Sequence, residues 1–339
     1  MGKKGNKIVS DVVVDLQYGD SGKGKVAYHL AKHGNYTHVM RYNGGANAGH
    51  TVYHEGVKFI THSVPVGVLF GVDSIIGPGC VLNPESFFEE VKALNDQGIV
   101  TKDKLFIAKN THIITDEHLN EDSDETRIGT TRRGIGPVYR DKYARIGIRA
   151  EDIAELKDYV VDVHDLLHSG GDKVVLGEGA QGFGLDIDWG DYPYVTSSHP
   201  TVAGAIMSGL PPNSIRDVWG VVKAYETYVG AKDFQPEGEV FEKIQKAGKE
   251  FGATTGRARQ TNWMDTDLVT RGALHNSITK LVVNKCDILR DVGAWGLIEN
   301  GQVTKYNSEA KFNDAVLKMA SGFGLSKGDI YFSESPERI

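Results

Sequence analysis

Glycine-rich clusters that also carry acidic and basic side chains are the part of this chain best suited to phosphate chemistry. The first cluster, residues 17–25, reads Gln-Tyr-Gly-Asp-Ser-Gly-Lys-Gly-Lys. Its glycines let backbone N–H groups approach a phosphate, and Lys23 can pair with phosphate oxygens. The P-loop string G-x-x-x-x-G-K-[ST] is absent. Taken alone, the segment is weak evidence, and a tight turn with solvated lysines is the alternative.

Two further clusters mix glycines with polar groups. Residues 41–51, Arg-Tyr-Asn-Gly-Gly-Ala-Asn-Ala-Gly-His-Thr, follow an apolar stretch. Their setting favours a ligand-binding role for His50, although a lone histidine is more often a surface or hydrogen-bonded core residue. Residues 128–137, Ile-Gly-Thr-Thr-Arg-Arg-Gly-Ile-Gly-Pro, are typical of a loop closing over an anion. An exposed mobile loop is the alternative.

The later clusters indicate base and carboxylate recognition. Amides and hydroxyls at 178–182 and 192–198 suit a base edge or a phosphate, or ordinary turns. Arg257 and Arg259 offer paired guanidinium forks to a dicarboxylate. Residues 284–287, Asn-Lys-Cys-Asp, have the NKxD form, whose aspartate can accept both guanine donors, but four residues also match by chance.

The elements that must position these clusters alternate along the chain. Apolar, β-branched runs predict strands at 12–16, 174–176, 219–222 and 281–283, and helical spacing predicts helices at 26–31, 85–94, 153–167, 265–274 and 310–319. This alternation predicts an α/β fold on a mainly parallel central sheet flanked by helices, with ligands at the carboxyl ends of the strands. Without an internal repeat or a Pro/Ser-rich linker, we expect one domain, residues 1–339, with inserted loops.

Composition excludes several classes of protein. With 339 residues, 40% hydrophobic and 24% charged, the chain is globular, and its net charge of −7 argues against a nucleic-acid-binding face. The cysteines Cys80 and Cys286 lie outside any CxxC or Cys/His cluster, so we expect no disulfide framework or zinc site and a reducing compartment. The apolar run 8–16 is short and carries Asp11 and Asp15, so we expect neither a signal peptide nor a membrane span, and a cytoplasmic protein.

In this order, the six clusters resemble adenylosuccinate synthetase over residues 12–287, with an echo at Ser-Glu-Ser-Pro, 333–336. The resemblance implies a fold related to P-loop GTPases, a homodimer, and a ligase that joins aspartate to C6 of a 6-oxopurine nucleotide with a nucleoside triphosphate and Mg²⁺. It implies that Asp20 is the base for the purine N1 proton, that His50 stabilises the transferring phosphoryl group, and that Lys23 neutralises its charge. A carboxylate near magnesium stays ionised and a histidine near phosphate stays protonated. Asp20 and the Gly49 carbonyl would hold the metal.

The resemblance also assigns residues to each substrate. The purine monophosphate site would contain Asn47, Thr130, Thr131, Gln181, Thr196, Val229 and Arg257, with Arg145 reaching it from the second subunit. The aspartate site would contain Thr255, Arg257 and Arg259. The triphosphate site would contain Ser21, Gly22, Lys23, Gly24, Lys25, Gly49, His50, Thr51, Lys285, Asp287, Ser333 and Pro336.

Departures from the family pattern bear on the substrate. Tyr18 and Ser21 replace a usual tryptophan and glutamate, and Ala258 and Gln260 interrupt a usual arginine run. These changes resemble the phage branch, which converts dGMP to 2-amino-2'-deoxyadenylosuccinate for diaminopurine DNA and would place the chain in a host cytoplasm. Asp20, often serine in that branch, points instead to IMP and adenylosuccinate, and short archaeal synthetases have a similar length. We favour dGMP over IMP.

The triphosphate and the alternatives to a ligase remain open at this level. The NKxD cluster favours GTP, whereas the altered Ser-Glu-Ser-Pro segment and the phage branch favour ATP or dATP, and Glu334 would add a clash or a contact there. A GTP-binding regulatory module would not need Thr255, Arg257 and Arg259. A catalytically inactive homologue would not need the retained Asp20, Lys23 and His50.

Overall fold

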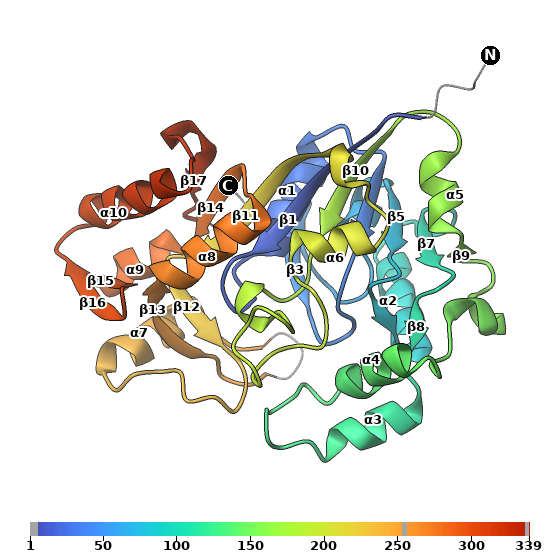
Figure 1. Cartoon of the computed structure of the whole chain (residues 1–339), viewed down its shortest axis with the longest axis horizontal. Helices are drawn as coiled ribbons and strands as arrows, with labels where there is room; N and C mark the ends of the chain where they lie inside the picture. Colours follow the sequence, from blue (N-terminus) through green and yellow to red (C-terminus); the bar gives the residue numbers. More distant parts are fainter. Residues whose placement is uncertain (1–5, 253–255, 336–338) are drawn as a thin grey trace.

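A computed structural model describes residues 6–252, 256–335 and 339, and its centre is a sheet of parallel strands (Figure 1). Among the described residues this sheet has nine strands, all paired in parallel. In spatial order they are β17 (Ile330–Phe332), β14 (Lys280–Asn284), β11 (Ile215–Lys223), β1 (Ile8–Asp15), β10 (Lys173–Glu178), β2 (His38–Arg41), β5 (Asp73–Ile76), β7 (Leu105–Ala108) and β9 (Val160–Val161). The predicted α/β class with a mainly parallel sheet is confirmed.

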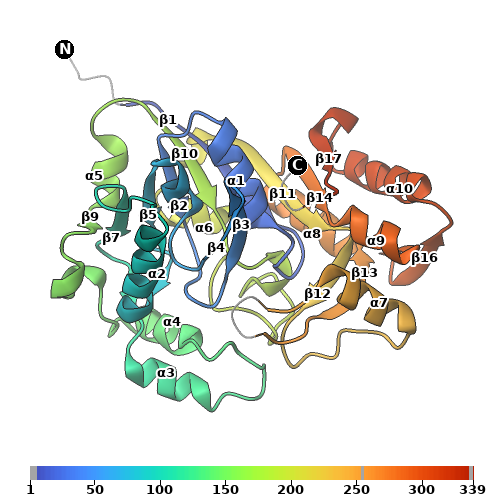
Figure 2. The ribbon, with the colours of Figure 1, turned by 180° about the vertical axis from the view of Figure 1, so that it is seen from behind.

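Helices cover both faces of the sheet, as expected for parallel strands buried on both sides. Helices α6 (Val202–Met207) and α8 (Thr266–Asn276) lie in front of it in Figure 1, and α1 (Lys23–His33) and α2 (Pro84–Asp96) lie in front in the reverse view of Figure 2. The other helices are α3 (Asp116–Ser123), α4 (Ile135–Ala144), α5 (Val163–His168), α7 (Glu239–Gly248), α9 (Cys286–Val292) and α10 (Glu309–Gly322). Val12, Val13 and Val14 of β1 are fully buried, which explains their continuous apolar run.

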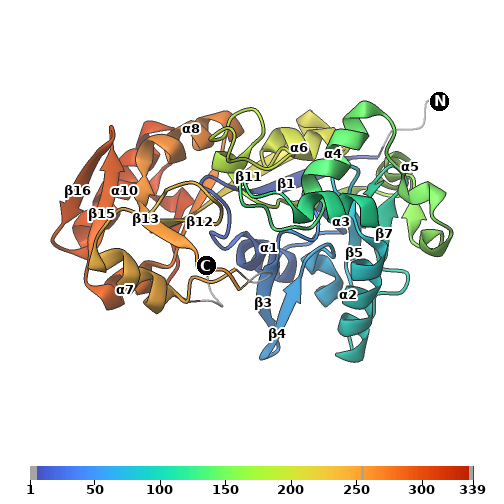
Figure 3. The ribbon, with the colours of Figure 1, turned by 90° about the horizontal axis from the view of Figure 1, so that it is seen from below.

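Smaller sheets extend the molecule away from the central one. The larger of them joins β12 (Tyr225–Tyr228), β13 (Gln260–Asp265), β15 (Trp295–Glu299) and β16 (Gln302–Tyr306). The hairpin β3 (His50–His54) and β4 (Val57–Thr61) and the parallel pair β6 (Val81–Leu82) and β8 (His112–Ile113) are two-stranded. Figure 3 shows the four-stranded sheet and the α3–α4 pair on opposite sides of α1.

Most predicted elements are confirmed, but the helix predicted over 153–167 is wrong. That segment contains a 3₁₀ turn at Ala154–Leu156, then β9, and then the short helix α5. The β-branched pair Val160–Val161 adds to the open edge of β7, and the Asp162 carboxylate accepts the Asp165 N–H to begin α5 anew. The helical spacing of apolar residues therefore predicted a helix wrongly, because part of the segment could pair with the edge of the sheet instead.

The parallel register brings the predicted clusters to one edge of the sheet. Arg41 and Glu178, the last residues of β2 and β10, are register partners, and Val13 of β1 is level with Glu178. Lys223 and Asn284 pair at the ends of β11 and β14. The clusters at 17–25, 41–51, 178–182 and 284–287 all follow these ends, as predicted. No helix in the described part of the chain is long and apolar enough to span a membrane.

Candidate active site

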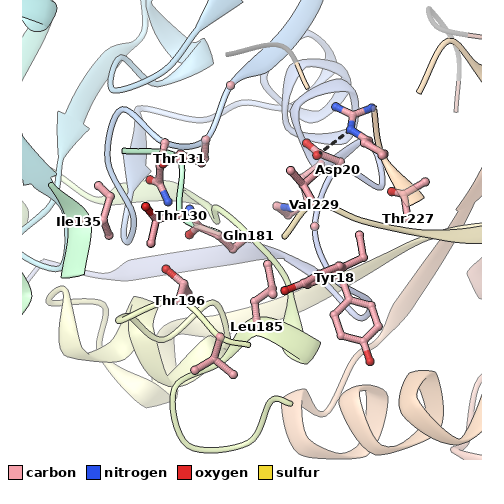
Figure 4. Close-up of a pocket in the computed structure, with 18 of the residues that line it drawn as sticks. Tyr18, Asp20, Thr130, Thr131, Ile135, Gln181, Leu185, Thr196, Thr227 and Val229 are labelled. Carbon is pink, nitrogen blue, oxygen red and sulfur yellow. Dashed lines mark ion pairs between the residues drawn. The ribbon is translucent and has the colours of Figure 1, made fainter. Parts of the chain in front are cut away.

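A pocket of about 360 Å³ opens at this edge of the sheet (Figure 4). Its walls come from the segments after β1, β2, β10 and β12 and from the loop 128–136. The predicted site residues on its walls are Asp20, Gly22, Lys23, Gly24, Lys25, Asn47, Gly49, His50, Thr51, Thr130, Thr131, Gln181, Thr196, Val229 and Arg259. Residues more than 200 positions apart in the sequence thus share one pocket.

The loop after β1 is organised by Asp15, a fully buried carboxylate that sequence reasoning did not assign to the site. It accepts hydrogen bonds from the backbone N–H groups of Gln17 at 2.9 Å and Ser21 at 3.2 Å. It also accepts one from Lys23 Nζ at 3.1 Å, whose side chain is 4% exposed. Gly22, at φ 96°, adopts the left-handed backbone that begins α1, and a side chain there would strike the Asn284 amide. An acidic residue at the end of a buried strand was the signal that could have revealed this role.

Ser21 lies inside this loop rather than on the pocket wall. Its hydroxyl donates to Gln17 Oε1 at 3.1 Å and to the Gly19 carbonyl at 3.3 Å, and its side chain is buried. The small residue therefore stabilises the turn, and no Ser21 atom lines the pocket.

Asp20 lies on the pocket wall, with its side chain 40% exposed. Its Oδ2 atom is 3.0 Å from Arg259 Nε, the ion pair dashed in Figure 4. The backbone of Asp20 has φ 57°, a strained value for a residue with a side chain. The first cluster and the arginine loop, remote in sequence, are therefore joined by opposite charges at the pocket.

His50 is held in a buried charged group with Glu178 and Arg41, whose roles the sequence did not reveal. His50 Nδ1 lies 2.5 Å from Glu178 Oε1, and Arg41 Nη1 donates to the same oxygen at 2.8 Å. The Val66 N–H donates to Glu178 Oε2 at 2.9 Å. Burial, and next the Arg41 guanidinium, lower the pKa of His50 to about 4. A pKa lowered in this way favours the neutral imidazole, whereas a neighbouring phosphate would favour the protonated histidine that we expect during phosphoryl transfer.

Gln181 presents a donor that the protein leaves unused. Asn43 Nδ2 donates to its Oε1 atom at 3.3 Å, which orients the amide. Its Nε2 atom is buried and makes no hydrogen bond to any described residue. Because an unsatisfied buried donor is costly, this amide is poised for an acceptor on a ligand in the pocket.

Residues predicted for the triphosphate base gather around Lys25, beside the pocket. Lys25 Nζ donates to Ser333 Oγ at 2.6 Å and to the Ser335 carbonyl at 3.1 Å. Burial lowers the pKa of Lys25 to about 8, against the opposing charge of Asp287. Lys285 Nζ donates to the Gly248 carbonyl at 3.1 Å. The NKxD cluster and the C-terminal segment thus meet at the first turn of α1, although neither lines the pocket.

Two further predicted residues, Arg145 and Arg257, are not on the pocket walls. Arg145 is exposed at the end of α4, away from the pocket walls. Arg257 is exposed and donates to the Gly129 carbonyl at 3.1 Å, so it reaches the 128–137 loop. Thr255 and Pro336 lie outside the described residues.

One group of side chains in the described ranges has metal-ligand spacing: Asp186, Asp188 and His199. His199 Nδ1 lies 3.4 Å from Asp186 Oδ2, and this pairing raises the pKa of the histidine. Asp186 Oδ2 is buried and makes no hydrogen bond to any described residue, so we assign this group no role.

Comparisons with known proteins identify the family and the fold. The family model of adenylosuccinate synthetase matches residues 12–159 and 153–297. A fully ligated adenylosuccinate synthetase from Plasmodium falciparum is 31% identical, with a TM-score of 0.78 over 88% of this chain and 83% of that one. The succinoaminodeoxyadenylate synthetase of cyanophage S-2L, bound to dGMP and to dATP as an energy donor, is 21% identical, with a TM-score of 0.76 over 98% of this chain and 94% of that one. The family model matches most of the chain, and the central parallel sheet and the pocket lined by the predicted clusters are consistent with that match. This chain therefore belongs to the adenylosuccinate synthetase family of carbon–nitrogen ligases.

Proposed function

We propose that this protein joins L-aspartate to C6 of a purine nucleoside monophosphate at the expense of a nucleoside triphosphate, and that dGMP is the purine substrate. The observation that carries the reaction is the convergence of Asp20, Lys23 and His50 on one pocket, whose wall also offers the unused Gln181 amide. An acid–base pair beside a phosphate-binding turn is what phosphoryl transfer to a purine oxygen requires.

The pocket residues account for the first half of the reaction. Asp20 takes the N1 proton of the purine, and O6 then attacks the γ-phosphate while the nucleoside diphosphate leaves. Lys23, next to the glycines of the α1 turn, faces the charge that develops on the transferring group. His50, backed by Glu178, directs its imidazole at the same group. Phosphate entry adds negative charge beside the imidazole and favours its protonation.

Aspartate completes the reaction. Its amino group attacks C6 of the 6-phosphoryl purine, and inorganic phosphate leaves. Arg259, on the pocket wall, and Arg257, at the edge of the 128–137 loop, supply guanidinium groups for its two carboxylates. Thr255 is assigned to this site by resemblance alone. Gln181, Thr130, Thr131, Thr196 and Asn47 offer amide and hydroxyl groups to the purine monophosphate.

The pocket also suits the magnesium ion on which the family depends. Mg²⁺ prefers oxygen ligands and keeps several water or phosphate oxygens. The partly exposed Asp20 carboxylate and the Gly49 backbone carbonyl, both on the pocket wall, fit that preference. When bound there, the ion would neutralise phosphate charge during transfer.

Support for dGMP comes from Tyr18 and Ser21, which depart from the family pattern, and from a shared fold with the cyanophage enzyme bound to dGMP. IMP is the alternative, favoured by the retained Asp20. For the donor, Asp287 favours guanine because a carboxylate accepts from its N1–H and 2-amino groups. Glu334 pairs with Arg290 at 2.6 Å at the surface and does not obstruct Lys25.

The test crosses dGMP, GMP and IMP with GTP, ATP and dATP in the presence of Mg²⁺ and aspartate, and follows the product by mass. We expect a succinylated product from dGMP and phosphate release that requires aspartate. Product from IMP alone would refute the dGMP assignment and leave an adenylosuccinate synthetase. Triphosphate hydrolysis without any aspartate dependence would instead indicate a regulatory module.

A further inference from the structure

Four side chains of alternating charge run from the pocket wall into the interior of the protein. Asp20 pairs with Arg259 Nε at 3.0 Å, and Arg259 Nη1 donates to Glu250 Oε2 at 2.6 Å. Lys223 Nζ donates to Glu250 Oε1 at 3.1 Å and to Thr227 Oγ1 at 2.6 Å. Asp20 is the exposed end of this row of charged side chains, and Arg259, Glu250 and Lys223 are almost fully buried.

Glu250 is the centre of the group. Its side chain is 1% exposed, and its two oxygens accept hydrogen bonds from Arg259, Lys223 and the Tyr225 hydroxyl, the last at 2.6 Å. Burial would raise the pKa of Glu250, but Lys223 and then Arg259 outweigh it and lower the pKa to about 2. The carboxylate is therefore charged, and both of its oxygens accept hydrogen bonds.

The two edges of the Arg259 guanidinium consequently differ. The Nη1 edge faces a buried carboxylate that no solvent can replace, and the Arg259 backbone N–H also donates to the Glu250 carbonyl at 2.9 Å. The Nε atom lies 3.0 Å from Asp20 Oδ2, on a side chain that is 40% exposed at the pocket wall, but it makes no hydrogen bond to any described residue. An exposed ion pair contributes little free energy, whereas breaking a buried pair leaves an uncompensated charge and is costly.

We propose that Glu250, neutralised by Lys223, is a positioning residue that holds Arg259 by its Nη1 edge, so that the Nε edge can pass from Asp20 to a carboxylate of the bound aspartate. This exchange would release Asp20 for the purine only when the second substrate is present. The role rests on the proposed function, because it takes Arg259 as an aspartate ligand.

The test is a kinetic cycle of Glu250→Gln, Arg259→Ala and the double variant. Glu242→Gln, on α7 with its side chain 62% exposed, is the matched control. Glu250→Gln is nearly isosteric but lacks the charge that holds the guanidinium. We expect it to raise KM for aspartate by about tenfold to a hundredfold, with KM for the purine monophosphate within about threefold of wild type. In the Arg259→Ala background, the same change should have almost no further effect on KM for aspartate.

A second readout does not need activity. In ¹⁵N-labelled protein, the Arg259 Nε–H signal, assigned by its loss in Arg259→Lys, should exchange with solvent at least about tenfold faster in Glu250→Gln than in Glu242→Gln. Additive kinetic effects, or an unchanged exchange rate, would overturn the positioning role and leave Glu250 a stabilising residue only. If the wild type shows no aspartate-dependent turnover, the proposed function fails, and the exchange rate alone decides whether Glu250 holds Arg259.

Discussion

Replacing Asp15 by asparagine should destabilise the protein far more than a change of one atom suggests. Asp15 is fully buried and accepts from two backbone N–H groups and from Lys23 Nζ at 3.1 Å. Asparagine keeps only one oxygen, so it can accept from one of the two backbone N–H groups but not from both, and it leaves the Lys23 ammonium, 4% exposed, without a countercharge. Removing one partner of a buried ion pair costs about 3–5 kcal/mol, so we expect a loss of this size in the free energy of unfolding.

Urea denaturation followed by circular dichroism measures this loss, with Asp172→Asn as the control, because Asp172 is exposed and accepts from the Lys7 N–H at 3.0 Å. The control should stay within about 0.5 kcal/mol of wild type. Lys23→Met in the Asp15→Asn background should recover part of the loss, since the unpaired charge is then gone. A loss below about 1 kcal/mol for Asp15→Asn, or a double variant less stable than the sum of the single changes, would refute the argument.

Three further predictions concern the pocket. The pKa of His50 is about 4 in the folded protein, against an ordinary value of 6.5, so the unfolded chain binds the proton first as the pH falls. The contribution of His50 to stability is therefore present above pH 6.5 and is lost as the pH falls toward 4. Over that window the free energy of unfolding should fall more steeply for wild type than for His50→Asn, and equal slopes would contradict a neutral imidazole. Asp20→Asn should lower kcat by about 10²–10⁴-fold while Kd for the triphosphate, measured by calorimetry without magnesium, changes little; near-normal turnover would exclude Asp20 as the base. Arg145→Leu should raise KM for the purine monophosphate without changing Tm. If Arg145 acts across a homodimer, mixing this variant with the inactive Asp20→Asn variant should restore turnover. No restoration after subunit exchange would place Arg145 outside the partner's site.

Local patterns were sufficient for most of the fold. Strands buried on both faces, such as residues 12–14, can be recognised from apolar runs alone. The start of α2 can be recognised from Asn83, which caps the helix, and from Pro84, its first residue. The four-stranded sheet of β12, β13, β15 and β16 was not anticipated, because its strands are short and partly polar. The segment 153–167 was mistaken because pairing with the edge of β7 outweighed its helical spacing. A single domain over residues 1–339 stays a prediction.

The sequence by itself determined which residue types and loops could bind phosphate, purine and aspartate, because glycine turns, hydroxyls and paired arginines have their chemistry wherever they are placed. Only the tertiary structure decided which of them meet. It joined Asp20 to Arg259, placed Glu178 and Arg41 around His50, and buried Glu250 behind the pocket. These contacts span more than a hundred residues in several cases, and a buried charge reveals its partner only once the chain has folded, since desolvation is what makes the pairing necessary.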